Sequence, residues 1–287
     1  MEKPALKQRL MTIADADFTP PVDAFELAST AMGHIGDSDP LLRDELIYGS
    51  LARWIVNGIF SSQQLHSLAT TLLDDHHLGY RLGEKDTDSI FTRSFSMLLL
   101  APILYQHRRQ AVFTASEFQS MLQRVLTVFA GEQDLRGFVE EKGWAHAVAH
   151  GGDVLDEFAW CHEVQSPDLQ RVLSVIQKKI CQGDVLFAFD EDERLATPAI
   201  AVLQRGVLTL EEVNAWFDTF KAYLEDTLDP PMRMWRAANV RHFLRSMDYR
   251  LVSLDLHAFR GALSPVLSLV SPYRSNTASD EGVAEAD

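Results

Sequence analysis

Cysteine is scarce in this sequence, which has only Cys161 and Cys181 among its 287 residues. A chain of this length can build its own hydrophobic core, so a disulfide framework is neither needed nor indicated. The first residues carry mixed charges without an apolar stretch, so we expect no secretory signal. The most apolar run, residues 97–104, is far shorter than the roughly 20 residues that span a bilayer. These absences predict a cytoplasmic protein that does not enter a membrane.

Glycine and proline are also infrequent, at 15 and 11 residues, whereas 46% of the chain is hydrophobic. This composition excludes a collagen-like, low-complexity or wholly disordered chain. The sequence contains no Gly-rich phosphate loop, no G-x-S-x-G nucleophile elbow and no EF-hand loop. We therefore expect a globular protein whose activity is not indicated by a common catalytic motif.

Basic residues are the minority among the charged ones, because 26 Lys and Arg stand against 41 Asp and Glu. The resulting net charge of −15 repels phosphate groups, which argues against nucleic acid and against anionic membranes as partners. An acidic surface favours a basic partner, so we expect a protein or peptide partner that carries positive charge.

The chain is rich in helix signals, since apolar residues recur at three- and four-residue spacing in nearly every segment. Three helix starts repeat one pattern, in which Ser61, Thr114 or Thr209 is followed three residues later by Gln or Glu. This pattern is a capping box, and apolar residues flank each copy at the spacing of a hydrophobic staple. Ser166 marks a weaker fourth start. The sequence therefore predicts an all-α protein.

The four starts lie 53, 52 and 43 residues apart, which is the length of an antiparallel helix pair with its linkers. The second helices of the pairs are predicted at residues 40–57, 88–107, 142–162, 192–204 and 231–254. We predict an α-solenoid of about five antiparallel helix pairs, similar to HEAT or armadillo arrays, as one domain over residues 1–272. An irregular all-α bundle is the alternative. Residues 273–287 are small, polar and acidic, and are predicted to be a disordered tail.

Residues 142–158 contain the pattern with the clearest chemistry. If this segment is one helix, His146, His150 and Asp153 share a narrow band, with Trp144 on the opposite side. Two imidazoles at positions i and i+4 with a carboxylate one turn later can bind a divalent metal such as zinc. A histidine beside a carboxylate can also transfer protons. These three residues are therefore our candidates for a metal or catalytic site.

A simpler interpretation of the same segment needs no ligand. Histidines on the polar face of a helix are commonly solvated or hydrogen-bonded to the next helix, and H-x-x-x-H without a glutamate is a weak motif. Gly151 and Gly152 lower helix propensity by roughly 1 kcal/mol each, so we expect a neighbouring helix to approach the backbone closely there.

Several arginines stand among apolar neighbours, namely Arg43, Arg93, Arg136 and Arg245. In helical repeats such residues commonly form buried ladders that hold neighbouring pairs in register, and we favour this interpretation. The alternative is that they converge with His146 and His150 on a concave groove and form a site for an anion or a carboxylate.

Five segments occur in a fixed order: D-P-L-L-R-D from residue 39, F-T-R-S-F from 91, D-L-R-G from 134, G-W-A-H-A-V-A-H-G from 143 and F-L-R-S from 243. Together they resemble a bacterial family of unknown function, whose hallmark is G-W-A-H-A-x-A-H followed by an aspartate. The resemblance spans roughly residues 38–254. It implies a HEAT-like, all-helical fold and draws attention to His146, His150, Asp153, Arg93 and Arg136. It implies no activity.

We therefore expect a cytoplasmic helical-repeat protein that binds a protein or peptide partner through its concave face, without a cofactor. The candidate binding residues are Arg93, Arg136, Trp144, His146, His150, Asp153 and Arg245. The alternative function is a hydrolase-like enzyme, either metal-dependent or acid–base, with its site at His146, His150 and Asp153.

Overall fold

The computed structural model describes residues 1–225 and 228–271, so the acidic tail predicted over 273–287 lies outside the described residues. The regular secondary structure of the described residues is almost entirely helical, which confirms the predicted all-α class. None of the helices in these two ranges combines the length and the apolar character needed to cross a membrane. The elements are α1 (Lys3–Asp15), α2 (Ala24–Met32), the π-helix η1 (Leu41–Tyr48), α3 (Gly49–Val56), α4 (Ser62–Leu72), α5 (Ser89–Arg109), α6 (Ala115–Gly131), β1 (Phe138–Val139), β2 (Gly143–Trp144), α7 (Ala147–Trp160), α8 (Ser166–Ile180), α9 (Glu191–Gln204), α10 (Leu210–Glu225), α11 (Met232–Ser253), the short 3₁₀-helix η2 (His257–Phe259) and α12 (Arg260–Leu269).

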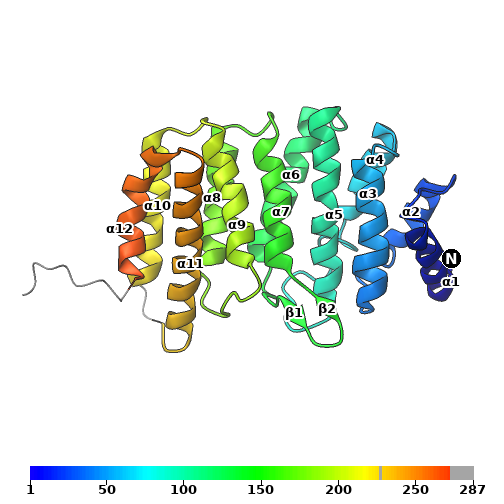
Figure 1. Ribbon diagram of the computed structural model, residues 1–287, viewed down its shortest axis with the longest axis horizontal. Helices are drawn as coiled ribbons and strands as arrows, with labels where there is room; N and C mark the ends of the chain where they lie inside the picture. The colour runs from blue at the N-terminus through cyan, green and yellow to red at the C-terminus, as the bar shows by residue number, and fades with distance from the viewer. Residues whose placement is uncertain (226–227, 272–287) are drawn as a thin grey trace, which may run out of the picture.

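The helices lie in two rows that run along the long axis of the molecule (Figure 1). The row nearer the viewer contains α3, α5, α7, α9 and α11, and each helix packs against the next one in the row. The other row contains α4, α6, α8 and α10. The main hydrophobic core is continuous from α1 to α12, because each row buries its apolar side chains against the other.

The repeated helix starts form the predicted capping boxes. Ser61 Oγ accepts a hydrogen bond from the backbone N–H of Gln64, whose side chain accepts one from the N–H of Ser61. The same reciprocal pair is formed at Thr114 and at Thr209. The fourth start differs, since Ser166 is the first residue of α8 and its hydroxyl does not cap the helix. Three of the four starts therefore depend on local sequence signals.

The predicted helix over residues 142–162 is wrong at its beginning. Gly143 and Trp144 form the strand β2, which pairs with β1, and α7 starts only at Ala147. His146 has left-handed backbone angles, with φ of 51°, and this conformation breaks the helix before Ala147. Trp144 therefore does not lie opposite His146 but stacks on its ring, with centroids 4.5 Å apart.

The reason for this local structure lies about 100 residues earlier in the chain. The buried guanidinium of Arg43 donates hydrogen bonds to the carbonyls of Lys142 and Trp144, at 2.6 and 3.2 Å. Gly143 has a φ of +75° and lies so close to Pro40 that a Cβ would come within 2.8 Å of that ring. A tertiary contact thus overrides the helical preference of residues 142–146.

Gly151 and Gly152 lie where neighbouring helices approach α7, as predicted. A Cβ on Gly151 would overlap the ring of Phe129 in α6, and one on Gly152 would lie 2.6 Å from the carbonyl oxygen of Arg194 in α9. The two glycines let α7 pack tightly between its neighbours, which fixes the position of the histidine-bearing turn next to them.

Candidate functional site

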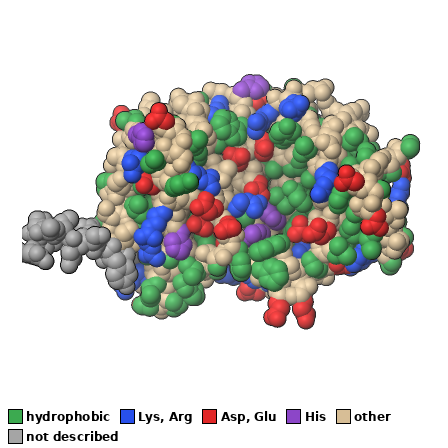
Figure 2. All heavy atoms as spheres, viewed as in Figure 1, with side chains coloured by type: hydrophobic (Ala, Val, Ile, Leu, Met, Phe, Trp, Pro, Cys, Tyr) green, Lys and Arg blue, Asp and Glu red, His purple; other side chains and the backbone are tan. Residues whose placement is uncertain are grey.

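A pocket of about 640 Å³ opens between η1, α7 and α9. Figure 2 shows histidine, acidic and basic side chains gathered around α7 and α9 on the face formed by the first row of helices. The lining consists of three aspartates, two histidines, three aromatic residues, one arginine and two aliphatic residues: Asp44, Tyr48, Leu98, Trp144, His146, His150, Asp153, Ala188, Phe189, Asp190 and Arg194.

His150 lies at the floor of this pocket with only 6% of its surface exposed. The hydroxyl of Ser94 in α5 donates to the carbonyl of Ala145 and lies 2.7 Å from Nδ1 of His150. Because a serine hydroxyl has only one hydrogen, Nδ1 of His150 must be the donor in this second bond. Nε2 of His150 is then unprotonated, and no described residue forms a hydrogen bond with it.

The electrostatic environment keeps this imidazole neutral. Burial lowers the pKa of His150 well below its usual value, and the nearby charges of His146 and Arg194 lower it further. The ring of Phe95 meets it edge-on, with centroids 5.0 Å apart. The pocket floor therefore presents a neutral nitrogen that can accept a hydrogen bond or a proton.

We expect the buried neutral state of His150 to make folding stability depend on pH. Below pH 6.5 the unfolded chain takes up a proton at this residue while the folded protein does not, so the free energy of unfolding falls as the pH is lowered. The expected slope approaches 1.4 kcal/mol per pH unit between the lowered folded pKa and about 6.5, and the contribution is constant above that range. Urea unfolding of the wild type and of His150→Gln from pH 5 to 8 measures this slope.

His257→Gln changes an exposed histidine and should retain the wild-type slope. An unchanged slope in His150→Gln would contradict the buried neutral state of His150.

His146 is held in one orientation by contacts on all sides. Its Nε2 lies 3.0 Å from the carbonyl oxygen of Phe189 and 3.5 Å from Oε1 of Glu191, so this nitrogen carries the proton. Burial alone would raise the pKa of Glu191, but hydrogen bonds from His146 and from the N–H of Phe189 lower it overall. Trp144 covers one face of the imidazole. His146 thus acts as a fixed donor that joins β2 to the start of α9.

The π-helix η1 contributes two polar groups to the pocket. The predicted helix over 40–57 is present as η1 followed by α3, but its first half has the wider π geometry. π-helical turns are rare and occur often at functional sites. Asp44 and Tyr48 both face the pocket from η1, and no described residue forms a hydrogen bond with either side chain. Burial raises the pKa of Asp44, as does its neighbour Glu45, while burial and the charge of Asp153 raise that of Tyr48 to about 12.

Asp153 and Arg194 form an ion pair across the pocket. Nε of Arg194 donates to Oδ1 of Asp153 at 2.7 Å, and Nη2 donates to Oδ2, so the pair is bidentate. Both side chains are partly exposed. Asp190, which directly precedes α9, has left-handed backbone angles with φ of 63°, as His146 has at the start of α7. Two strained non-glycine residues therefore border the same pocket, which is typical of functional sites.

The structure brings together four of the residues predicted from the sequence and separates the other three. Trp144, His146, His150 and Asp153 line the pocket. Arg93 is fully buried elsewhere, with its guanidinium paired to Glu132. Arg136 pairs with Asp134, and Arg245 is exposed on α11; neither belongs to the pocket lining.

A metal site is not arranged among the residues that the structure describes. No group of three His, Cys, Asp or Glu side chains in these ranges is placed to hold a metal ion. The carboxylate of Asp153 faces Arg194 instead, and Nδ1 of His150 faces Ser94.

Sequence reasoning missed Asp44, Tyr48, Phe189 and Arg194. The only signal for Arg194 was its distance of 41 residues from Asp153, which is close to the 43-residue interval between two helix starts. Asp44 and Tyr48 are four residues apart, so they would share a helix face in any case, but nothing in the sequence indicates that this face borders α7 and α9.

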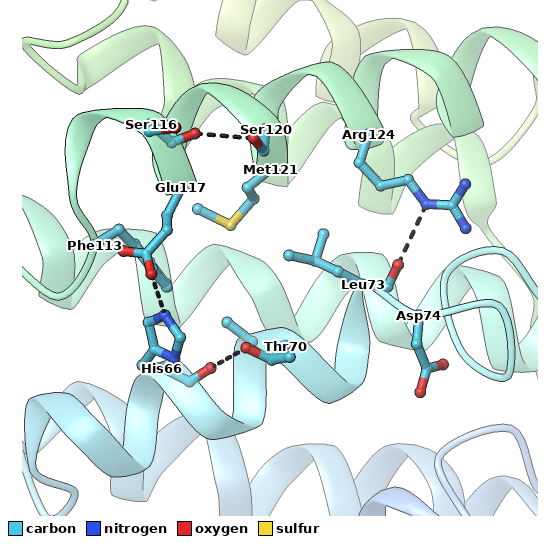
Figure 3. Close-up of a pocket in the computed structure, with 11 residues that line it drawn as sticks. His66, Thr70, Leu73, Asp74, Phe113, Ser116, Glu117, Ser120, Met121 and Arg124 are labelled. Atoms are coloured by element: carbon cyan, nitrogen blue, oxygen red, sulfur yellow. Dashed lines mark hydrogen bonds and ion pairs between the residues drawn. The ribbon is translucent and has the colours of Figure 1, made fainter.

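A second hollow, of about 450 Å³, lies between α4 and α6 in the other row (Figure 3). Several of its polar side chains already have partners within the fold. His66 bonds the capping residue Glu117 at 3.0 Å, and Arg124 donates to the carbonyl of Leu73. These contacts join α4 to α6 across the groove and leave it with little free polar chemistry.

The chain matches a protein-family model, whereas comparison with curated proteins and with solved structures gives no match. The matching model is described as "Protein of unknown function (DUF2785)" and covers residues 78–248, which is more than half of the chain. The matched range includes every pocket residue except Asp44 and Tyr48. The chain belongs to this DUF2785 family.

Proposed function

We propose that this protein is a cytoplasmic, HEAT-like α-solenoid that binds a protein or peptide partner at the pocket between η1, α7 and α9. The two rows of helices and the 43- to 53-residue intervals between helix starts support the repeat architecture. Both cysteines are buried and unpaired, which suits a reducing compartment. In solenoids, the face formed by one row of helices commonly provides an extended binding surface.

The observation that carries this proposal is the exposed aromatic rim of the pocket. Trp144 is 36% exposed and Phe189 is 43% exposed, and their rings meet edge-on with centroids 5.5 Å apart. Large aromatic side chains at a pocket mouth are typical of residues that dominate binding energy in protein interfaces. The same pocket is lined by Asp44, Tyr48 and His150, and no described residue forms a hydrogen bond with the carboxylate of Asp44, the hydroxyl of Tyr48 or Nε2 of His150. The rim provides apolar contact area and the floor provides directional bonds.

Replacing Trp144 with alanine is expected to weaken the binding of a peptide partner at least about tenfold. Peptides selected from a random display library on the wild-type protein supply the probes, and titration calorimetry measures their dissociation constants. Trp160→Ala is the matched control, because Trp160 is 39% exposed and lies at the far end of α7, outside the pocket. Peptides that bind equally well to Trp144→Ala, or a selection that yields no binder, would contradict the proposal.

A second candidate function is acid–base catalysis of hydrolysis at the same pocket. It is favoured by one observation, the neutral Nε2 of His150 in a pocket that also contains the carboxyl of Asp44. A general base of this kind contributes typically 10²–10⁴-fold to a rate. Turnover of ester, amide and phosphoester substrates that falls about 100-fold in His150→Gln would support it.

The metal-dependent form of this candidate needs a rearrangement of the pocket. Zinc held by His146, His150 and Asp153 would require Asp153 to release Arg194. Elemental analysis of untagged wild-type protein and of His146→Ala tests this form, which requires stoichiometric metal that is lost in the variant.

A further inference from the structure

The candidate pocket continues into a second hollow on the other side of Trp144. This neighbouring hollow has a volume of about 460 Å³ and shares Trp144 and Asp44 with the first. Its remaining lining is Pro40, Leu41, Glu45, Phe138, Glu141 and Gly143. The ring of Phe138 meets that of Trp144 edge-on, with centroids 5.1 Å apart. The two hollows thus form one depression with an aromatic ridge in its middle, which we call the Trp144 depression.

The free charges of the Trp144 depression are negative. The carboxylates of Asp44, Glu45, Glu141 and Asp190 line it, and none of them forms a hydrogen bond or an ion pair with a described residue. The one arginine in the lining, Arg194, is already paired with Asp153. The buried guanidinium of Arg43 lies behind Asp44 and offsets part of this charge. The depression therefore attracts positive charge and repels anions.

Aromatic rings beside free carboxylates are the elements of an organic-cation site. A guanidinium or ammonium group is attracted to the face of a tryptophan within about 6 Å, and the attraction increases when water is excluded. The partly exposed ring of Trp144 shares the lining of the first hollow with Asp44 and Asp190, and the lining of the second with Asp44 and Glu141. A cation placed on this ridge would contact a ring and a carboxylate at once.

The acceptors at the bottom of the depression distinguish among cations. Nε2 of His150 carries a lone pair, its side chain is more than nine-tenths buried, and no described residue satisfies this atom. A quaternary ammonium group has no N–H to donate and would leave Nε2 and Asp44 without partners. Guanidinium offers five N–H donors in a planar fork that can bond a carboxylate and stack on an aromatic ring together, whereas an ammonium group is a compact point charge.

We infer that the Trp144 depression binds the guanidinium group of an arginine side chain, presented by a basic segment of the protein partner. This inference rests on the proposed peptide-binding function and specifies the residue type that the pocket takes. The guanidinium contacts the part of the Trp144 ring that His146 leaves uncovered, and it donates hydrogen bonds to the carboxylate of Asp44 and to Nε2 of His150.

Blocked tripeptides test the inference without a known partner. The probes are acetyl-Gly-Arg-Gly-amide, its lysine and trimethyllysine counterparts, and its citrulline counterpart, which has nearly the shape of arginine but no charge. Chemical shift changes in two-dimensional NMR spectra of the full chain report the binding of each probe. The arginine peptide is expected to bind at least about tenfold more tightly than the citrulline and trimethyllysine peptides, and more tightly than the lysine peptide.

Asp44→Asn is the informative variant, because it removes one charge and keeps the shape of the side chain. This variant is expected to bind the arginine peptide about tenfold more weakly than the wild type does, while its weak affinity for the citrulline peptide stays unchanged. Asp255→Asn, in which a 94% exposed carboxylate outside the depression changes, should behave as the wild type. Circular dichroism verifies that both variants are folded.

Several outcomes overturn the inference. Equal affinity for the arginine and citrulline peptides does so, as does preference for lysine or trimethyllysine, absence of binding by every probe, or an arginine affinity that Asp44→Asn does not change. The library peptides test the proposed peptide-binding function independently of the arginine assignment. Library peptides that depend on Trp144 but contain no arginine leave peptide binding intact and remove the arginine assignment, whereas a library without any Trp144-dependent peptide removes both.

Discussion

Replacing Glu132 with glutamine is expected to lower the free energy of unfolding by about 3–5 kcal/mol. Glu132 and Arg93 are both fully buried, and the carboxylate accepts two hydrogen bonds from the guanidinium, Nε–Oε2 at 2.6 Å and Nη2–Oε1 at 2.9 Å. The neutral amide would leave the positive charge of Arg93 inside the protein without a counter-charge, which is far less favourable than losing an exposed pair. Urea unfolding followed by circular dichroism at pH 7 measures the difference.

The matched control breaks an ion pair at the surface. Asp218→Asn removes the partner of Lys221 within α10, where both side chains are exposed, and is expected to cost less than about 1 kcal/mol. A loss of the same size in both variants would show that the charge of Arg93 is not balanced by Glu132. A large loss only in Glu132→Gln would support the interpretation that Arg93 is a structural residue that joins α5 to the end of α6, and not a ligand-binding one.

The further contacts of Arg93 explain why its side chain is unavailable to a ligand. Nη1 donates to the carbonyls of Tyr80 and Arg81 and to the hydroxyl of Ser89, at 2.9, 3.2 and 2.8 Å. The guanidinium thus fastens the loop before α5 to the residue that follows α6. Among the arginines that the sequence set in apolar surroundings, Arg93 and Arg43 are fully buried, whereas Arg245 is exposed.

Features that depend on local sequence were predictable. The capping residues Ser61, Thr114 and Thr209 act within one helical turn, so their hydrogen bonds follow from spacing alone. Gly151 and Gly152 were expected at a close helix contact because no other feature explains two glycines inside a helix. His146 and His150 could be paired because they are four residues apart on one segment, and they do line one pocket.

Features that depend on distant partners were not predictable from one sequence. The start of α7 was placed too early, since the contacts that unwind residues 142–146 come from Arg43 and Pro40. Arg93 could not be assigned to Glu132, because nothing in a charge pattern selects a partner 39 residues away. Asp44 lies in the site because η1 borders the pocket formed with α7 and α9, and this tertiary arrangement is not specified by the residues around position 44.

Replacing Arg43 with lysine is expected to lower the free energy of unfolding by about 2–4 kcal/mol. The guanidinium is fully buried and donates to three carbonyls, those of Asp37, Lys142 and Trp144. It also lies over the ring of Phe91, 4.1 Å from the centroid. One ammonium group cannot reach carbonyls on both sides of this site, and each buried carbonyl left without a donor costs about 1–3 kcal/mol. Urea unfolding measures the loss.

Arg53→Lys is the matched control, because Arg53 also covers a phenylalanine ring, that of Phe18, but is exposed and donates to the single carbonyl of Gly49. It is expected to cost less than about 1 kcal/mol. Since Arg43 holds the backbone of Trp144 against η1, Arg43→Lys should also weaken peptide binding, whereas Arg53→Lys should not. Equal stabilities of the two variants would contradict the role of Arg43, and unchanged peptide binding in a destabilised Arg43→Lys would show that Trp144 keeps its place without this contact.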